Sequence, residues 1–153
     1  MRFWLVYLLS LSSVAHAGEL IGKVVNVHDG DTLTVLVGSR QVRVRLAEID
    51  APERKQAFGT RSRQSLAELC AGAVARVIER GKDRYGRTLG TVHCASADVN
   101  AEQVRRGMAW VFGRFAAKDS PLHALQAEAR ASARGLWADP RPVEPWAWRR
   151  VQR

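Results

Sequence analysis

Residues 20–46 read LIGKVVNVHDGDTLTVLVGSRQVRVRL, and this stretch decides the fold. In its second half, from 32 to 37 and from 42 to 46, side chains alternate as they do in strands that have one buried face. The pairs Asp29-Gly30 and Gly38-Ser39 separate the three apolar runs and are typical of tight turns. The stretch therefore predicts three consecutive antiparallel strands.

The rest of the chain adds helices and two more strands. Ala51-Pro52 interrupts the strand pattern and opens a polar loop over 53–60. Three segments carry helical periodicity or capping residues. They are 61–71, a segment with Asn100 as its N-cap and Gly107 just past its end, and a segment that starts at Ser120, has Pro121 at its first position and ends at Gly135. The further strands are expected over 74–79 and 88–94.

Five short strands with a helix between the third and fourth predict a mainly β fold with α-helices. The expected architecture is a five-stranded OB barrel with three helices. The same pattern also allows an SH3-like barrel or another α+β arrangement. We expect one domain over 18–138, followed by a tail over 139–153 that is rich in Pro, Trp and Arg.

The first residues have the features of a secretory signal peptide over 1–17. Arg2 precedes an apolar run, and Ala15-His16-Ala17 has the small residues of a cleavage site. The run is shorter than the roughly 20 residues that span a bilayer, so a retained anchor is the less favoured alternative. We expect cleavage after Ala17 and a secreted or periplasmic product. In that oxidising compartment Cys70 and Cys94 are expected to pair, two buried free thiols being the alternative.

The chain is strongly basic, with 24 Lys and Arg against 15 Asp and Glu and a formal net charge of +9. Such a protein attracts polyanions, of which nucleic acid is the commonest and an anionic membrane surface is the competitor. A membrane-surface protein needs a helix with a basic face and a bulky apolar face, whereas the expected helices are Ala-rich and of mixed charge. We therefore favour nucleic acid, expect no stable membrane partner, and expect a monomer. A merely soluble basic surface is the alternative.

The side chains that point to chemistry are acids and arginines at strand ends. Asp31 follows the first turn, and Asp50 follows the third strand. If the first and third strands lie side by side in a barrel, the two carboxylates meet near one rim and repel each other unless a cation lies between them. Hard oxygen ligands of this kind suit Ca²⁺ or Mg²⁺. Each segment alone is ordinarily a turn or a loop, so the interpretation depends on their joint order and spacing.

Three segments in this order resemble the staphylococcal nuclease (thermonuclease) family. They are VHDGDT at 27–32, VRLAEIDAPE at 44–53 and DRYGR at 83–87. Weaker similarity extends the resemblance from about Gly22 to Trp137. The resemblance implies an OB barrel with three helices and a Ca²⁺-dependent phosphodiesterase that cuts DNA and RNA with little sequence preference. Single-stranded or locally open nucleic acid is the expected substrate.

The resemblance also implies roles for eight residues of these motifs and for Phe115. The implied roles are Asp31, Asp50 and the Ala51 carbonyl as Ca²⁺ ligands; Glu53 as the general base or as the group that orients the attacking water; Arg45 and Arg87 as holders of the scissile phosphate; and Arg84, Tyr85 and Phe115 as substrate contacts. A dication and two guanidinium groups stabilise the charge that develops on phosphate oxygens in the transition state.

The sequence departs from the family pattern where bases are expected to stack. Gly113 stands at one stacking position, and Phe115 lacks a hydroxyl, so stacking is expected to be weaker or to move to Trp110 or Phe112. At the position of Ala51 the family often has Thr, which is compatible with ligation through a backbone oxygen.

Two other functions are weighed against a nuclease. One is an OB barrel that binds single strands and has lost catalysis, and the other is a basic envelope or surface protein. A pure binder has no need for a metal-binding acid pair beside a phosphate site, because acids repel its ligand. The full set of acids and arginines therefore favours a nuclease.

Overall fold

The computed structural model describes residues 18–153. The expected signal peptide over 1–17 and its cleavage site lie outside the described residues. Among residues 18–153, no helix is long and apolar enough to cross a membrane.

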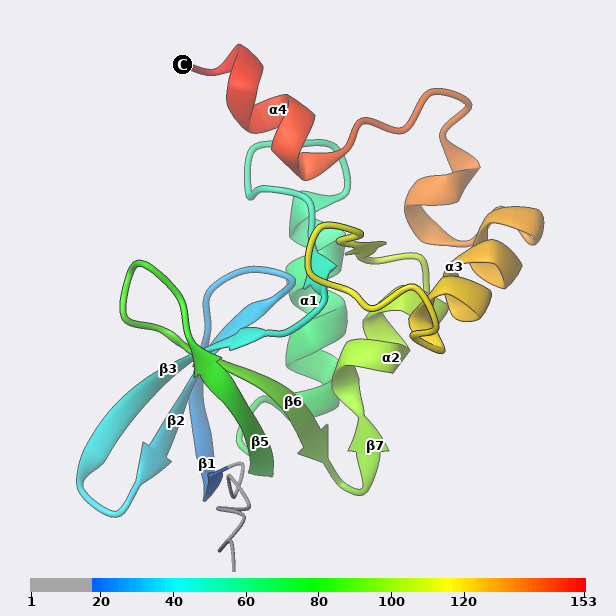
Figure 1. Cartoon of the computed structure of the whole chain (residues 1–153). Coiled ribbons are helices and arrows are strands. Elements are labelled where there is room, and N and C mark those ends of the chain that lie inside the picture. Colours follow the sequence, from blue (N-terminus) through cyan, green and yellow to red (C-terminus); the bar gives the residue numbers. More distant parts are fainter. Residues whose placement is uncertain (1–17) are drawn as a thin grey trace, which may run out of the picture.

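Five strands close into a barrel, which Figure 1 shows on the side of the molecule away from α3. Their bounds are β1 Glu19–Val27, β2 Thr32–Val37, β3 Arg40–Leu46, β5 Val74–Lys82 and β6 Thr88–Cys94. Neighbours run antiparallel in the order β3-β2-β1-β5-β6, and a parallel pairing of β3 with β6 closes the barrel. The closed barrel with added helices confirms the predicted mainly β fold of OB type.

The alternation in the sequence determines which side chains fill the barrel. Leu33 pairs with Val44, and Val35 pairs with Val42, across β2 and β3. All four side chains are buried, whereas Arg43 between the two valines is exposed. Each strand therefore places one face in the core and the other toward solvent.

Three short strands, four α-helices and one 3₁₀ helix complete the described chain. They are β4 Ile49–Asp50, α1 Gly59–Cys70, β7 Ala97–Asp98, α2 Val99–Arg105, β8 Trp110–Val111, α3 Leu122–Ala131, the 3₁₀ helix η1 Gly135–Ala138 and α4 Pro145–Val151. β4 pairs with β8, and β7 extends the sheet beside β6. The helices α1 to α3 pack beside the barrel, and α4 lies at the top of the view in Figure 1.

The predicted N-cap of α2 is wrong. The cap is Asp98, whose carboxylate accepts a hydrogen bond of 3.0 Å from the Ala101 N–H. Asn100 lies inside the helix, buried, and its Nδ2 donates to the carbonyls of Ala47 and Gly90 at 3.0 and 3.1 Å. Because Asn100 satisfies backbone groups between the barrel and the helix, the residue two positions earlier takes the capping role.

The last part of the chain differs from the prediction in three ways. α3 ends at Ala131 rather than at Gly135, and Pro121 is its N-cap residue rather than its first helical residue. Positive φ angles of 49° at Ala133 and 54° at Gly135 break the α-helical path there. The three-helix prediction also lacked α4, which forms within the Pro-rich tail.

Cys70, at the end of α1, and Cys94, at the end of β6, form a disulfide with Cα atoms 5.5 Å apart. The predicted pairing is therefore present. Both residues are buried, so the bridge fastens the end of α1 to the barrel from the inside.

The tail folds back on the domain through aromatic rings. Trp146 of α4 lies parallel to Phe112 with ring centroids 5.2 Å apart and an interplanar angle of 19°. It also meets Trp110 edge-on at 5.9 Å, and Trp110 in turn packs against Trp137 at 4.3 Å. This second apolar cluster attaches α4 to the same end of the barrel that carries the acidic residues.

Candidate active site

Two buried aspartates lie side by side at one end of the barrel. Asp31 follows the turn after β1, and Asp50 lies in β4; their exposed fractions are 5% and 1%. A single guanidinium group contacts both, because Arg45 Nη1 lies 3.3 Å from Asp31 Oδ2 and Arg45 Nη2 lies 3.2 Å from Asp50 Oδ1. The structure thus brings the two carboxylates together, but the predicted side-by-side placement of the first and third strands is wrong, because β2 lies between them. Asp31 reaches this end of the barrel because the next residue, Thr32, pairs with Arg45 across β2 and β3.

Backbone donors and a buried amide hold Asp31 in place. Its Oδ2 accepts a hydrogen bond of 2.7 Å from the Ala51 N–H, and its Oδ1 accepts one of 3.0 Å from Thr32 Oγ1. The preceding carbonyl of Gly30 accepts from Gln103 Nε2 at 2.7 Å. Gly30 also lies so close to α1 that a Cβ would overlap the Ser62 side chain. Gln103 is a supporting residue that sequence reasoning missed, because its partner lies in a distant turn.

Hydrogen bonds fix the position of the Arg45 guanidinium group but leave some of its N–H donors unused. Its Nη1 donates to the carbonyls of Leu46 and Ile49, both at 2.8 Å, and its Nη2 donates to Asp50. A guanidinium group has five N–H donors, so Nε and one hydrogen of Nη2 have no partner among residues 18–153. These two N–H groups are free to bind an anionic ligand.

The site carries an excess of buried acid. Burial raises the pKa of Asp50, and the charge of Asp31 adds to this effect, although hydrogen bonds from Arg149 and the charge of Arg45 oppose it. Asp29, whose Oδ1 accepts a hydrogen bond of 3.0 Å from the Asp31 N–H, has its pKa raised to about 7 by burial and by the neighbouring Asp31 charge. A cation between these carboxylates would relieve both effects.

A guanidinium group from the tail already contacts this acidic site. Arg149 Nη2 lies 2.7 Å from Asp50 Oδ2, and Arg149 Nη1 lies 3.2 Å from Asp50 Oδ1 and 2.8 Å from Glu53 Oε1. Arg149 was not predicted as a site residue. The local signal for α4 is Pro145 at the helix start with basic residues in the last turn. That pattern does not reveal the distant partner.

The β5–β6 hairpin carries the predicted phosphate and base contacts. Arg87 Nε donates to Asp83 Oδ2 at 2.6 Å, while Asp83 Oδ1 accepts from the N–H groups of Tyr85 and Arg87. Partial burial acts to raise the pKa of Asp83, but the hydrogen bonds from Arg87 and Tyr85 hold it below its usual value. Arg84 lies over the Tyr85 ring at 4.9 Å. Arg87 is thus oriented by its own hairpin and does not contact the two aspartates.

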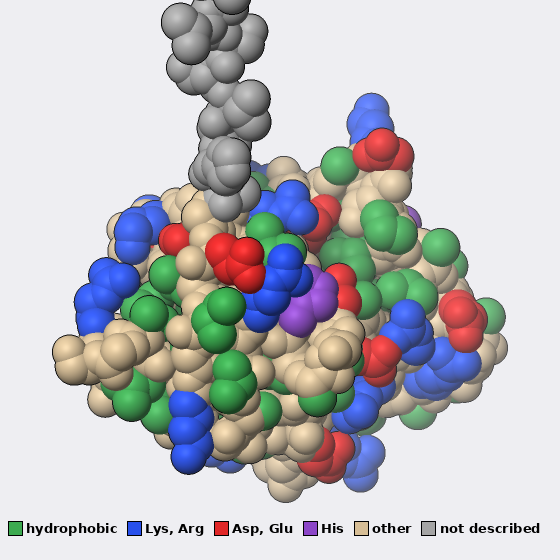
Figure 2. All heavy atoms as spheres, turned by 90° about the horizontal axis from the view of Figure 1, so that it is seen from below, with side chains coloured by type: hydrophobic (Ala, Val, Ile, Leu, Met, Phe, Trp, Pro, Cys, Tyr) green, Lys and Arg blue, Asp and Glu red, His purple; other side chains and the backbone are tan. Residues whose placement is uncertain are grey.

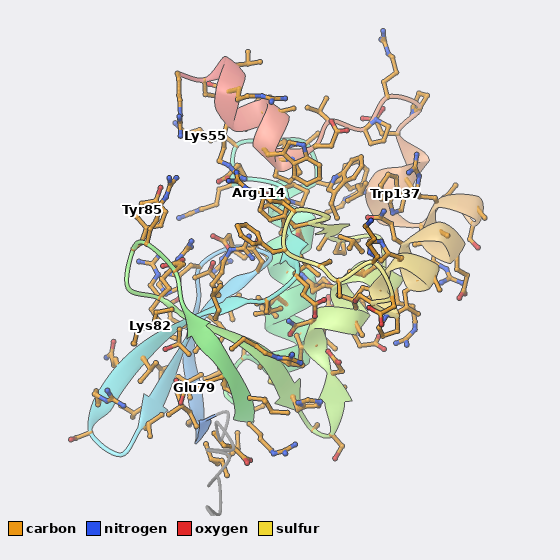
Figure 3. All side chains as sticks on the ribbon, in the orientation of Figure 1. Lys55, Glu79, Lys82, Tyr85, Arg114 and Trp137 are labelled. Carbon is orange, nitrogen blue, oxygen red and sulfur yellow. A yellow bond between two sulfur atoms is a disulfide. The ribbon has the colours of Figure 1, made fainter. Side chains whose placement is uncertain are left out.

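A cleft of 1480 Å³ joins these groups. Its lining includes Asp31, Arg45, Asp50, Ala51 and Glu53, the hairpin residues Arg84, Tyr85 and Arg87, the loop residues Phe112 to Phe115, and Trp146, Arg149, Arg150 and Arg153 of the tail. Figure 3 shows Tyr85 at the hairpin tip, on the side that faces α4, and Arg114 beneath α4. All nine residues assigned by the resemblance line this one cleft.

Two rings of the cleft are largely exposed. Tyr85 is 69% exposed and Phe115 is 66% exposed. Trp110, one of the two alternative stacking residues, is 8% exposed with its ring against Trp137, so that alternative is wrong. Phe112, the other alternative, already packs against two rings, Trp146 in parallel and Phe115 edge-on.

The residues present fit one hard divalent cation. Among residues 18–153 no group of three or more His, Cys, Asp or Glu side chains surrounds a single position. The protein ligands would therefore be the carboxylates of Asp31 and Asp50 together with a backbone oxygen such as that of Ala51, whose N–H already binds Asp31. Such sites are completed by water and suit Ca²⁺. Both oxygens of Asp50 already accept hydrogen bonds from guanidinium groups, Oδ1 from Arg45 and Arg149 and Oδ2 from Arg149.

Comparison with known proteins assigns the family. The model of the family described as "Staphylococcal nuclease homologue" matches residues 43–139, more than half of the chain. The chain belongs to the staphylococcal nuclease family. It is 51% identical over 143 residues to Protein ParB of Escherichia coli, covering 86% of this chain and 80% of the relative. It is 44% identical over 152 residues to the Micrococcal nuclease of Shigella flexneri, covering 92% and 87%.

A third relative of this staphylococcal nuclease homologue is an uncharacterized endonuclease of Haemophilus influenzae, 46% identical over 134 residues, with 86% of this chain and 74% of the relative covered. The family match confirms the resemblance. It contains Arg45, Asp50, Glu53 and Arg87, whereas Asp31 and Arg149 lie outside the matched segment. Part of the site is therefore supplied by segments that flank it.

Proposed function

We propose that this protein, a nuclease of the staphylococcal nuclease family, hydrolyses phosphodiester bonds of DNA and RNA with Ca²⁺ as its cofactor. The buried pair Asp31 and Asp50, joined by Arg45 on the floor of a basic cleft, carries the proposal. Nuclease and endonuclease relatives support the reaction class. In a protein that only bound nucleic acid, buried acids at this position would lower the affinity, because they repel phosphate.

Arg45, Arg87 and Glu53 have separate roles in the proposed hydrolysis. The two unpartnered N–H groups of Arg45 bind a non-bridging phosphate oxygen, and Arg87 binds the phosphate from the opposite hairpin. Preorganised donors of this kind stabilise the charge that develops in the transition state. Glu53 lies at the edge of the acidic site, with its side chain 40% exposed, and accepts a proton from the attacking water. Asp31 and Asp50 would hold the Ca²⁺ ion, which would supply Lewis-acid polarisation of the phosphate and of that water.

The expected breadth of substrates follows from the same contacts. Arginine forks bind phosphate oxygens, which carry no sequence information, so little sequence preference is expected. The exposed rings of Tyr85 and Phe115 suit unpaired bases, because stacking tolerates every base. Single-stranded or locally open DNA and RNA are therefore the proposed substrates.

We also propose that the protein is exported, to the periplasm or the medium. The N-terminal pattern over 1–17 supports export, and the disulfide between Cys70 and Cys94 fits an oxidising compartment. N-terminal sequencing of the exported protein should give Gly18 as its first residue.

Plasmid DNA and a single-stranded RNA, incubated with the purified mature chain, test the activity. Both should be degraded with Ca²⁺ and left intact with a chelator. An Asp50→Asn variant should leave both intact under either condition. Undegraded nucleic acid with the wild-type chain and Ca²⁺ would favour the binding module instead.

A further inference from the structure

Two arginines at the end of the tail line the cleft without an acidic partner. Arg150, in the last turn of α4, and Arg153, three residues later, are both exposed and both belong to the cleft lining. Neither forms an ion pair with a carboxylate of residues 18–153, in contrast to their neighbour Arg149. Unpaired cations that face a cleft favour an anionic ligand from outside the chain.

The opposite wall of the cleft is also basic. Arg80, Lys82 and Arg84 come from β5 and its hairpin, line the same cleft, and form no ion pair with a carboxylate of the described residues. Among the labelled side chains of Figure 3, Lys82 and Tyr85 mark this wall below α4. The candidate catalytic groups therefore lie on a floor between two basic walls.

The tail side of the cleft, formed by α4 and the residues after it, is held in a fixed place. Trp146 of α4 packs against Phe112 in parallel at 5.2 Å and against Trp110 edge-on at 5.9 Å, and neither contact involves Asp50. Arg149 adds an ion pair with the buried carboxylate of Asp50. Arg150 is thus presented from a positioned helix, and Arg153 follows two residues after the end of that helix. Positioned charges bind with a smaller loss of side-chain and segment entropy than free ones.

We propose that α4 and the residues that follow it form a second substrate wall, in which Arg150 and Arg153 bind phosphates of a single nucleic-acid strand next to the scissile bond. This inference rests on the proposed function and assigns the tail a place in it. The cleft of 1480 Å³ exceeds the roughly 300–1,000 Å³ of a small-molecule site, which suits several nucleotides. The exposed rings of Tyr85 and Phe115 add surfaces for unpaired bases.

An anionic membrane surface fits this arrangement less well. A flat bilayer cannot reach basic groups that face each other across a cleft. On the face of the molecule turned away from α4, basic side chains are scattered among acidic and uncharged ones (Figure 2). The concentration of unpaired arginines on the cleft walls therefore favours a strand that enters the cleft.

The double variant Arg150→Gln/Arg153→Gln tests the wall. Its matched control is Arg40→Gln/Arg141→Gln, which removes the same charge from two exposed arginines that do not line the cleft. Binding of a fluorescently labelled oligothymidylate is followed by anisotropy at several KCl concentrations, with chelator present so that no strand is cut. Circular dichroism melts establish that both variants fold as the wild type does.

The wall variant should bind the oligothymidylate at least tenfold more weakly than the wild type. Its slope of log K against log salt should be smaller by about 1.4, since each single-strand phosphate contact contributes about 0.7. The control should stay within about twofold of the wild type, as is usual for surface changes away from a site. Equal losses in the two variants, or no loss in either, would overturn the inference.

Two further measurements, of vesicle binding and of cleavage, distinguish a wrong substrate wall from a wrong nuclease function. Vesicles of anionic phosphatidylserine are titrated against the same proteins, and loss of vesicle binding alone in the wall variant would also overturn the inference. Ca²⁺ is then restored to the wild-type sample. Uncut oligothymidylate at this step would refute the proposed nuclease function. If the wild type cuts it but the wall variant and the control variant lose the same binding affinity, only the substrate wall is refuted.

Discussion

Arg149 and Asp50, 99 residues apart in the sequence, form a two-pronged ion pair on the floor of the cleft, with N–O distances of 2.7 and 3.2 Å. The tail is therefore anchored on a carboxylate that is also the proposed ligand of Ca²⁺. Like unit charges about 4 Å apart repel by about 4 kcal/mol at an effective dielectric constant near 20, and a dication doubles this. We therefore expect guanidinium and metal to compete for Asp50.

This competition predicts that Arg149→Gln binds Ca²⁺ more tightly than the wild type, by about tenfold, which corresponds to about 1.4 kcal/mol. Isothermal titration calorimetry without nucleic acid measures the affinity directly. Arg141→Gln is the control, because it removes the same charge from the tail at an exposed position outside the cleft. Unchanged or weaker Ca²⁺ binding by Arg149→Gln would show that the two cations do not compete.

Replacing Glu53 by Gln should slow cleavage by about 10²- to 10⁴-fold, the usual contribution of a general base. Oligonucleotide affinity should change little, because the basic walls remain. Single-turnover cleavage and anisotropy measure the two effects separately. Glu48→Gln is the control, since Glu48 lines the same cleft but forms no ion pair among the described residues. A variant that cuts at the wild-type rate would remove Glu53 from this role.

Local sequence patterns were sufficient for the strands of the barrel, because the alternation over 32–46 decides which side chains are buried. The meeting of Asp31 and Asp50 was expected from neighbouring first and third strands, whereas the pairing of β2 with β3 produces it. The same local reasoning predicted Asn100 as a helix cap. That prediction failed because a local pattern carries no information on the hydrogen bond from Asn100 to the carbonyl of Gly90 on β6.

The contacts of the tail with the site could not be predicted from the sequence for a different reason. A helical start at Pro145 is readable locally, but the contact of Arg149 with Asp50 depends on the path of the whole intervening chain. The packing of Trp146 on Phe112 depends on the same path. Residues whose roles arise from such long-range contacts need the fold before they can be assigned.

Asp83→Asn should lower the melting temperature at pH 7, because it removes the carboxylate that holds Arg87 and the hairpin backbone. The pKa of Asp83 lies below its ordinary value of 3.8 in the folded protein. Its stabilisation is therefore complete above about pH 4 and is lost as the pH falls through the folded-state pKa. Melts between pH 7 and pH 2 should show the gap between wild type and variant closing below pH 4. A gap that stays constant to pH 2 would contradict this assignment.

Reduction of the disulfide between Cys70 and Cys94 should lower the free energy of unfolding by about 3–4 kcal/mol in the chain-entropy model. Urea denaturation of the oxidised and reduced wild-type chain measures the difference. A Cys70→Ala/Cys94→Ala variant should match the reduced protein and be insensitive to reductant. Oxidised and reduced chains with the same midpoint would show that the bridge does not stabilise the fold.

Asp31 and Asp50 are proposed to bind one divalent cation together, and Ca²⁺ titration calorimetry of Asp31→Asn and Asp50→Asn measures this binding. Asp119→Asn, at an exposed position outside the cleft, is the matched control. We expect one Ca²⁺ per chain for the wild type and the control, and at least a 100-fold loss of affinity in each site variant. Wild-type Ca²⁺ affinity in either Asp31→Asn or Asp50→Asn would show that the two carboxylates do not share a cation.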